Sequence, residues 1–120
     1  MHLQTGRRGE NIAREFLVKA GYTILEQNWR CGRIEIDIIA RQNNTIVFVE
    51  VKTRSSRWVA DPAQSVDPEK ESRISYAAVS YLDMINHEWT FRFDIISILL
   101  LPGRRPEIEH FPDAFFPGME

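Results

Sequence analysis

The segment around Asn43-Asn44 constrains the fold of this chain more than any other feature of its sequence. Before the two asparagines, isoleucines alternate with acidic residues over Ile34–Ile38, and after them Thr45–Lys52 is rich in β-branched residues. Two such runs on either side of an asparagine turn are typical of a β-hairpin. Positions Ile46–Val49 are apolar on both faces, as in a strand that is covered on both sides. The hairpin is therefore expected to lie inside the protein.

Helical patterns flank this hairpin. A first helix is predicted over about Thr5–Ala20, where apolar residues recur at helical spacing and Gly21 supplies a stop. Tyr22–Arg30 is predicted to form a strand. A second helix is predicted to begin at Asp67-Pro68, an N-cap followed by proline at the first helical position. Its apolar stripe comprises Ile74, Ala77, Ala78, Tyr81, Leu82 and Ile85.

The remaining segments complete a single α/β domain. Residues 54–66 are polar and form a long loop, whereas Thr90–Leu101 is rich in Phe, Ile and Leu and predicts a strand that ends at Pro102-Gly103. Arg105–Phe111 can return beside it as an edge strand, and the last nine residues are expected to be irregular. The order α, β, β, β, α, β predicts one domain over residues 1–120, with a core at about 6–101 and a C-terminal tail at 102–120.

Composition excludes several classes of protein. The chain has 120 residues, of which 43% are hydrophobic and 27% charged, as in a soluble globular domain. Its longest stretches without a charged residue, Ile74–Leu82 and Ile95–Gly103, are much shorter than the roughly 20 apolar residues that span a bilayer. The N-terminus carries no secretory signal, so a cytoplasmic protein without a membrane span is expected. Cys31 and three scattered histidines offer no zinc-binding spacing.

The net charge of −2 conceals an asymmetry between the two halves of the chain. Residues 1–60 carry a net charge of +4 and residues 61–120 a net charge of −6. The first half could face a polyanion such as nucleic acid. A folded chain whose charges intermix on the surface is the simpler explanation of this feature taken alone.

Four charged residues of the hairpin suggest a metal site. A turn at Asn43-Asn44 pairs positions whose numbers sum to 87, which places Asp37 opposite Glu50. It also places Glu35 opposite Lys52 on the same face. Two opposed carboxylates repel, which raises the pKa of one of them and favours a cation between them, with Mg²⁺ the natural choice for oxygen ligands. The alternative is a solvent-facing strip that carries cross-strand ion pairs.

Several motifs together resemble the YraN family of small bacterial proteins. They lie between residues 6 and 98 and comprise Gly9-Glu10-x-x-Ala13, Gly21-Tyr22, Asn28-x-Arg30, Glu35-Ile36-Asp37-Ile38-Ile39-Ala40, Val47-Phe48-Val49-Glu50-Val51-Lys52-x-Arg54 and Arg92-Phe93-Asp94. That family is similar to archaeal Holliday-junction resolvases and to the wider restriction-endonuclease-like superfamily. The resemblance implies a restriction-endonuclease-like α/β fold with an αβββαβ core, a mixed central sheet flanked by helices, and an Asp…Glu-x-Lys site.

The same resemblance implies roles for individual residues. Asp37 and Glu50 would bind the metal, Mg²⁺ or Mn²⁺. Lys52 would position or activate the attacking water, and Glu10, from the first helix, would complete the catalytic site. Spacing alone would not single out Glu10, because an acidic residue in a first helical turn commonly complements the helix dipole.

Candidate nucleic-acid contacts flank these residues in sequence. Backbone phosphates could be gripped by four arginines, Arg7, Arg8, Arg54 and Arg57. Trp58 could stack on an unpaired base. A surface arginine is more often only solubilising, and a loop tryptophan more often packs on its own domain.

Taken with the resemblance, the sequence predicts a DNA-binding, metal-dependent endodeoxyribonuclease that hydrolyses phosphodiester bonds in branched, single-stranded or otherwise structured DNA. The alternative is a non-catalytic nucleic-acid-binding or adaptor module that retains the nuclease fold. A homodimer is expected by analogy with dimeric resolvases, and its apolar surface could include Phe111, Phe115 and Phe116. A tail folded onto its own domain is the alternative to that dimer.

Overall fold

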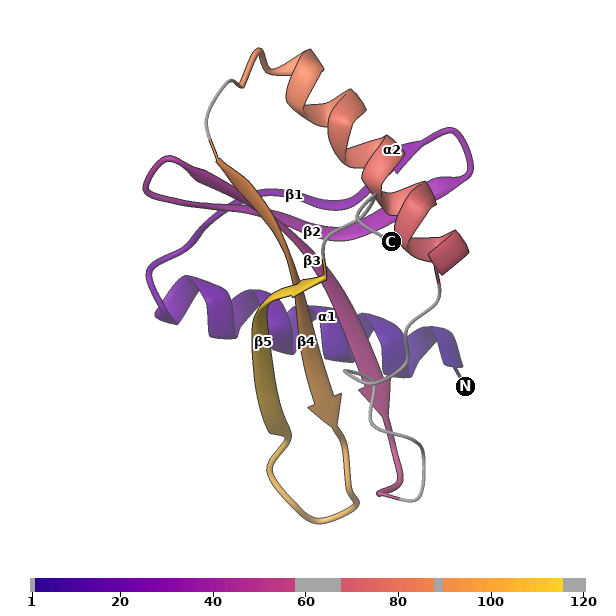
Figure 1. Cartoon of the computed structure of the whole chain (residues 1–120). Helices are drawn as coiled ribbons and strands as arrows, with labels where there is room; N and C mark the ends of the chain where they lie inside the picture. Colours follow the sequence, from indigo (N-terminus) through magenta and orange to yellow (C-terminus); the bar gives the residue numbers. More distant parts are fainter. Residues whose placement is uncertain (1, 58–67, 88–89, 116–120) are drawn as a thin grey trace.

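The computed structural model describes residues 2–57, 68–87 and 90–115 of the chain (Figure 1). Its elements are, in chain order, α1 (His2–Lys19), β1 (Thr23–Cys31), β2 (Ile34–Gln42), β3 (Thr45–Arg54), α2 (Pro68–Met84), β4 (Phe91–Leu99) and β5 (Glu107–Phe115). The predicted order of elements is confirmed, with β5 at its end. Among these described residues, neither helix is long and apolar enough to span a membrane.

The strands form one sheet in the order β1-β2-β3-β4-β5. Neighbouring strands are antiparallel except β3 and β4, which are parallel. Parallel neighbours need a crossover connection, and α2 lies in the connection between β3 and β4. The predicted α/β class, with a mixed central sheet flanked by helices, is confirmed.

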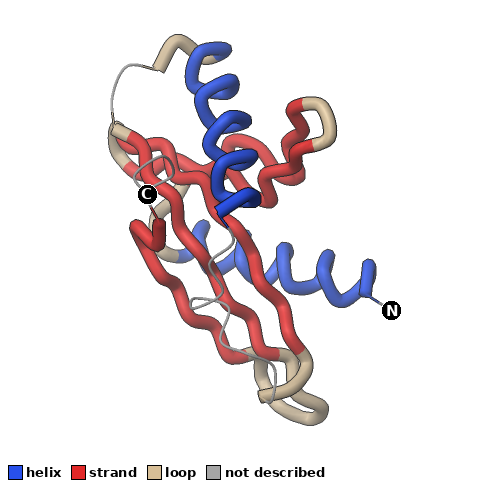
Figure 2. Tube along the Cα trace, turned by 45° about the vertical axis from the view of Figure 1, so that its right-hand side comes forward, coloured by secondary structure: helices blue, strands red, loops and turns tan. Residues whose placement is uncertain are grey.

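Helices α1 and α2 cover opposite faces of this sheet (Figure 2). Ala13 and Leu17 of α1 are buried in one apolar cluster, together with residues such as Val47 of β3. The other cluster joins Phe48 of β3 to the α2 residues Ile74, Ala77, Ala78, Tyr81 and Leu82. Strand β3 is thus covered on both sides, as its apolar sequence predicts.

The helix boundaries lie close to those predicted. Helix α1 begins at His2, three residues before the predicted start, and the chain turns at Gly21 with φ of 95°. Tyr22 N–H donates to the Leu17 carbonyl at 2.9 Å, a bond that closes a glycine-dependent helix end. Helix α2 ends at Met84, so Ile85 of the predicted stripe is 38% exposed. The predicted N-cap at Asp67 lies outside the described residues.

Strand β5 corrects the expectation of an irregular tail from residue 112. It pairs with β4 from Glu107, opposite Leu99, to Phe115, opposite Phe93. Pro112 lies within β5, and the edge position of this strand tolerates a proline, which cannot donate to a sheet ladder. The ladder shifts register between Phe93 and Ile95 of β4, and Asp113 has a φ of 57° there. This part of the predicted tail is therefore integral to the sheet.

Strands β2 and β3 keep the predicted register but separate sooner than predicted. Their pairs run from Gln42–Thr45 to Ile38–Val49, all at positions that sum to 87. Beyond Ile38, β2 remains paired with β1 as far as Ile34 and diverges from β3 (Figure 1). The predictions that place Asp37 opposite Glu50, and Glu35 opposite Lys52, are therefore wrong. The physical reason is that the twisted β1–β2 ribbon bends away from the sheet as a unit.

Candidate metal centre

Asp37 lies at the fork where β2 leaves β3. Its Oδ2 accepts a hydrogen bond from the backbone N–H of Val51 at 2.8 Å. The carboxylate thus supplies an acceptor to β3 just beyond the last backbone pair of the ladder, Ile38–Val49. The fork therefore fixes the position and direction of this side chain.

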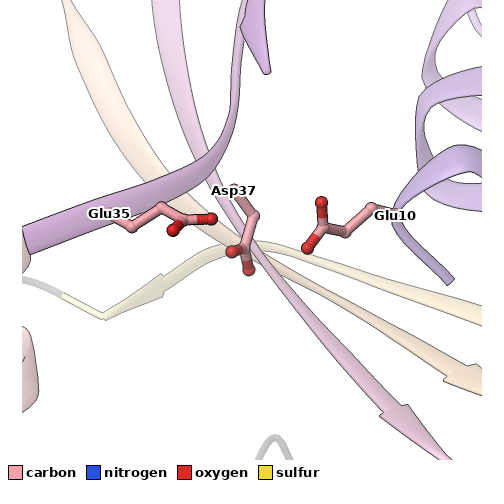
Figure 3. Close-up of side chains that lie close together, drawn as sticks. All are labelled: Glu10, Glu35 and Asp37. Carbon is pink, nitrogen blue, oxygen red and sulfur yellow. The ribbon is translucent and has the colours of Figure 1, made fainter. Parts of the chain in front are cut away.

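Three carboxylates converge at this fork. Oxygens of Glu10, Glu35 and Asp37 all lie within 4.8 Å of one another, and each side chain is half-buried. Figure 3 shows Glu10 reaching in from α1, while Glu35 and Asp37 project from β2. The structure thus brings together Asp37 and Glu10 of the predicted site. Glu35, which sequence reasoning took for the partner of Lys52, replaces Glu50 in the cluster.

Asn28 of β1 holds two of these carboxylates together, and sequence reasoning gave it no role in the site. Its Nδ2 donates to Glu10 Oε2 at 2.7 Å and to Glu35 Oε1 at 2.8 Å. The backbone at Asn28 is left-handed, with φ of 54°, a conformation that asparagine tolerates better than most residues. Arg30 adds an ion pair to Glu35 at 3.0 Å. The Asn28-x-Arg30 motif was the sequence feature from which this role of Asn28 could have been predicted.

Gly9 brings α1 close enough to β3 for Glu10 to reach the cluster. A Cβ added at Gly9 would lie 1.9 Å from Oγ1 of Thr53, which is far shorter than any real contact. Only glycine lets the helix backbone rest on this threonine. The glycine that opens the Gly9-Glu10 motif therefore sets the distance between Glu10 and the sheet.

The raised pKa of Asp37 is typical of a site that binds a cation. The pKa of Asp37 is raised to about 7: burial is the main cause, the charges of Glu10 and Glu50 add to the rise, and the Val51 hydrogen bond and Lys70 oppose it. The predicted rise in the pKa of one carboxylate is confirmed. Its main cause is desolvation, however, and Glu10 precedes Glu50 among the like charges.

Glu50 borders the cluster without joining it. One of its carboxylate oxygens forms an ion pair with Lys70 in the first turn of α2, and Nζ of Lys52 lies 3.7 Å from the same oxygen. Glu50 and Lys70 line the same cavity, of about 70 Å³, as Glu35 and Asp37. Lys70 was not predicted, because it follows Glu50 by twenty residues and only the packing of α2 on the sheet brings it here.

The residues predicted to contact nucleic acid lie in different environments. Arg7 and Arg8 are exposed on α1. Arg54 is half-buried at the end of β3, and Arg57 forms an ion pair with Glu107 of β5. Trp58 lies outside the described residues. Only the α1 arginines of this set are both exposed and without an ion pair among the residues that the structure describes.

Asp94 is fully buried but belongs to a structural network on β4. It accepts hydrogen bonds from Arg92, from Nε2 of His110 at 2.7 Å and from the backbone N–H of Asp113 at 2.9 Å. Burial alone would raise the pKa of Asp94, but the hydrogen bonds from His110, Arg92 and Asp113 outweigh it and lower the pKa. These bonds tie β5 to β4, which agrees with the ion-pair interpretation of the Arg92-Phe93-Asp94 motif.

The carboxylate cluster fits a small, hard divalent cation. Mg²⁺ and Mn²⁺ prefer oxygen ligands, and the three grouped side chains supply only carboxylate oxygens. A cation there would also remove the energetic cost of ionising the buried Asp37 beside two other carboxylates. In an ordinary strip of surface ion pairs, each carboxylate would have its own basic partner. Within the part of the chain that the structure describes, Glu35 forms an ion pair with Arg30, whereas Glu10 and Asp37 form none.

Comparison with protein families identifies relatives across most of the chain. The sequence model of UPF0102, described as an uncharacterised protein family, matches residues 9–98. A UPF0102 protein of Pelobacter propionicus is 48% identical over 114 residues, covering 92% of this chain and 81% of that protein. A UPF0102 protein of Syntrophus aciditrophicus is 47% identical, with 95% and 90% covered, and one of Rhodococcus opacus is 40% identical, with 95% and 98% covered.

Comparison with solved structures identifies a similar fold. The chain resembles Hjc of Archaeoglobus fulgidus, a Holliday junction resolvase from an archaeal hyperthermophile, with a TM-score of 0.50 and 18% sequence identity. The match covers 88% of this chain and 75% of that one. The predicted resolvase-like nuclease fold is thereby confirmed.

Proposed function

The chain belongs to the UPF0102 (YraN) family, and from that premise we propose that it is a metal-dependent nuclease that hydrolyses phosphodiester bonds in DNA. One observation carries the proposal: the carboxylates of Glu10, Glu35 and Asp37 meet at the fork of a resolvase-like sheet. A degenerate structural copy of the fold would have no reason to keep three like charges within 4.8 Å.

Glu10, Glu35 and Asp37 would hold Mg²⁺ or Mn²⁺. The bound cation would supply positive charge to the phosphate and make a water molecule more acidic. Asn28 orients two of the three ligands through its amide, and the sheet fork orients the third through Val51 N–H. The proposed ligand set differs from the pair expected from sequence, Asp37 with Glu50, and shares Asp37 with it.

Lys52 and Glu50 would act beside the cation. The Lys52 ammonium is held near Glu50 and is a compact charge that can stabilise developing negative charge on a phosphate or orient a water. Lys70 and Lys52 both pair with Oε1 of Glu50. We therefore assign Glu50 the task of holding Lys52, with metal ligation through its other oxygen as a second role.

The substrate part of the proposal is branched or otherwise structured DNA. Its support is the similarity in fold to a solved structure of a Holliday junction resolvase. A homodimer belongs to the same proposal, because a two-fold protein can address two strands of a junction at once. Light scattering over a concentration series tests the dimer, and a monomeric mass throughout would remove it.

Cleavage assays test the nuclease. Purified protein is incubated with duplex, flap, single-stranded and four-way-junction DNA, in Mg²⁺, in Mn²⁺ and in EDTA, beside the variants Asp37→Asn and Lys52→Ala. We expect cleavage that requires the metal and is lost in both variants. Equal cleavage by wild type and variants would mean a contaminating nuclease, and DNA binding without any cleavage would favour the adaptor function instead.

A further inference from the structure

A basic groove lies at the C-terminal end of β3, beyond the sheet fork. It has a volume of about 740 Å³ and is lined by Arg8 of α1, Ser55 after β3, and the turn between β4 and β5, residues 100–105. The turn contributes two more arginines, Arg104 and Arg105. In Figure 1 the end of β3 and the β4–β5 turn lie together at the lower end of the sheet.

The three arginines of this groove are available to bind an anionic ligand. Arg104 and Arg105 are exposed, as is Arg8, and none of the three forms an ion pair with a carboxylate in the part of the chain that the structure describes. Glu107, the first residue of β5, is instead neutralised by Arg57. Unpaired guanidinium groups that face one hollow attract a polyanion, and their planar donors match the oxygens of a phosphate.

The groove also lies at a useful distance from the carboxylates. Ser55 follows Val51, whose N–H binds Asp37, by four residues, and a strand rises about 3.3 Å per residue, so the groove begins roughly 13 Å from the metal centre along β3. Phosphates of one DNA strand advance about 3.4 Å per nucleotide along a duplex. One duplex arm can therefore reach both sites, with about four base pairs between them. Arg8, two residues before Glu10, links the groove to the metal centre on the α1 side.

We propose that Arg8, Arg104 and Arg105 form a phosphate-binding groove that holds the duplex arm of the DNA substrate about four base pairs from the metal centre. The proposal rests on the proposed function and adds two contacts, Arg104 and Arg105, that the sequence motifs leave out. It also moves the main phosphate contact away from Arg54 and Arg57. The groove orients the duplex arm on the protein, and the metal centre is where a phosphodiester bond of one DNA strand is hydrolysed.

Salt-dependent binding tests this groove without requiring cleavage. The affinity of the full chain for a fluorescein-labelled four-way junction is measured by anisotropy over a range of salt concentrations, in EDTA and in Ca²⁺. In Arg104→Ala/Arg105→Ala, we expect the slope of log affinity against log salt to become shallower by about 1.8, which is about 0.9 for each lost phosphate contact. Arg104→Lys/Arg105→Lys should recover most of the slope, because it keeps both charges.

The matched control removes two exposed arginines outside the groove, Arg14→Ala/Arg73→Ala, and should leave the slope close to that of the wild type. Melting temperatures of all variants show whether each is folded. Equal slopes for the groove variant and the control would overturn the groove, even if the wild type cleaves DNA. Cleavage lost in Asp37→Asn with an intact salt slope would leave the groove standing, and absence of DNA binding by the wild type would overturn both proposals.

Discussion

The backbone N–H of Val51 donates a hydrogen bond to Oδ2 of Asp37, 2.8 Å away, just past the last backbone pair between β2 and β3. A side chain thus takes over as acceptor for β3 where the neighbouring backbone turns away. The half-buried Asp37 carboxylate lies close to those of Glu10 and Glu35 (Figure 3). The divergence of β2 from β3 therefore also places Asp37 in the candidate metal centre.

Asp37→Asn should stabilise the metal-free protein above neutral pH. The asparagine keeps an oxygen for Val51 N–H but removes a charge that is buried beside two carboxylates. Because the native pKa of Asp37 is raised from 3.8 to about 7, the native state binds a proton that the unfolded state releases, and wild-type stability falls as pH rises through that interval. We expect the melting temperature of the variant in EDTA at pH 8 to exceed that of the wild type by at least about 4 °C.

Thermal melts across pH check the sign of this effect. The difference in melting temperature between variant and wild type should grow between about pH 4 and pH 7 and stay constant above pH 7. These limits are the pKa values of Asp37 in the unfolded and in the native state. Millimolar Mg²⁺ or Mn²⁺ should raise the wild-type melting temperature and have less effect on the variant, since binding to the native state alone stabilises it. A variant that melts below the wild type in EDTA, together with a wild type that ignores both ions, would contradict the metal centre.

Glu10→Gln and Glu35→Gln should each weaken Mn²⁺ binding by about tenfold or more, because each removes a charged oxygen ligand from the cluster. Glu50→Gln should have a smaller effect, since Glu50 is already paired with Lys70. Isothermal titration calorimetry measures the three affinities, with the exposed Glu26→Gln as the matched control. The ligand assignment is wrong if Glu50→Gln abolishes binding while Glu10→Gln and Glu35→Gln bind like the control.

Asn28 can be tested with a pair of substitutions that separate its amide from its backbone. Asn28→Gly and Asn28→Ala both lose the hydrogen bonds to Glu10 and Glu35, so each should lower Mn²⁺ affinity by about 10-fold to 100-fold, as loss of a ligand-orienting group commonly does. Only alanine is strained at φ of 54°, which should cost about 1–2 kcal/mol of unfolding free energy relative to glycine. Unchanged metal affinity in Asn28→Gly would assign Asn28 a purely conformational role.

Gly9→Ala should destabilise the protein by about 1–3 kcal/mol, because the new methyl group meets Oγ1 of Thr53 at 1.9 Å and α1 must move. Gly6→Ala is the matched control: its Cβ meets nothing within 4 Å, so it should stabilise the helix by about 0.5–1 kcal/mol. Urea unfolding measures both. Adding Thr53→Ala to Gly9→Ala should restore part of the loss, and equal effects of the two glycine substitutions would contradict the close approach.

Much of the architecture follows from the sequence alone, because it depends on local patterns. The alternating isoleucines, the Asn43-Asn44 turn and the apolar β3 determine the hairpin and its register, since side chains on a strand have a period of two. The stripe of α2 determines which face of that helix is buried, since its period matches the helix. Asp37 was identified from the register of this hairpin, whereas Glu10 was identified only through the family resemblance of the Gly9-Glu10 motif.

Only the tertiary structure decided which charged groups meet. The bend of the β1–β2 ribbon separates Asp37 from its expected partner Glu50, because strand divergence depends on twist and packing of the whole sheet. Asn28 and Lys70 enter the site from β1 and α2, where sequence distance conceals their proximity. Local sequence patterns therefore predict the helices, the strands and a few site residues. Which charged groups become neighbours depends on how these elements pack in three dimensions.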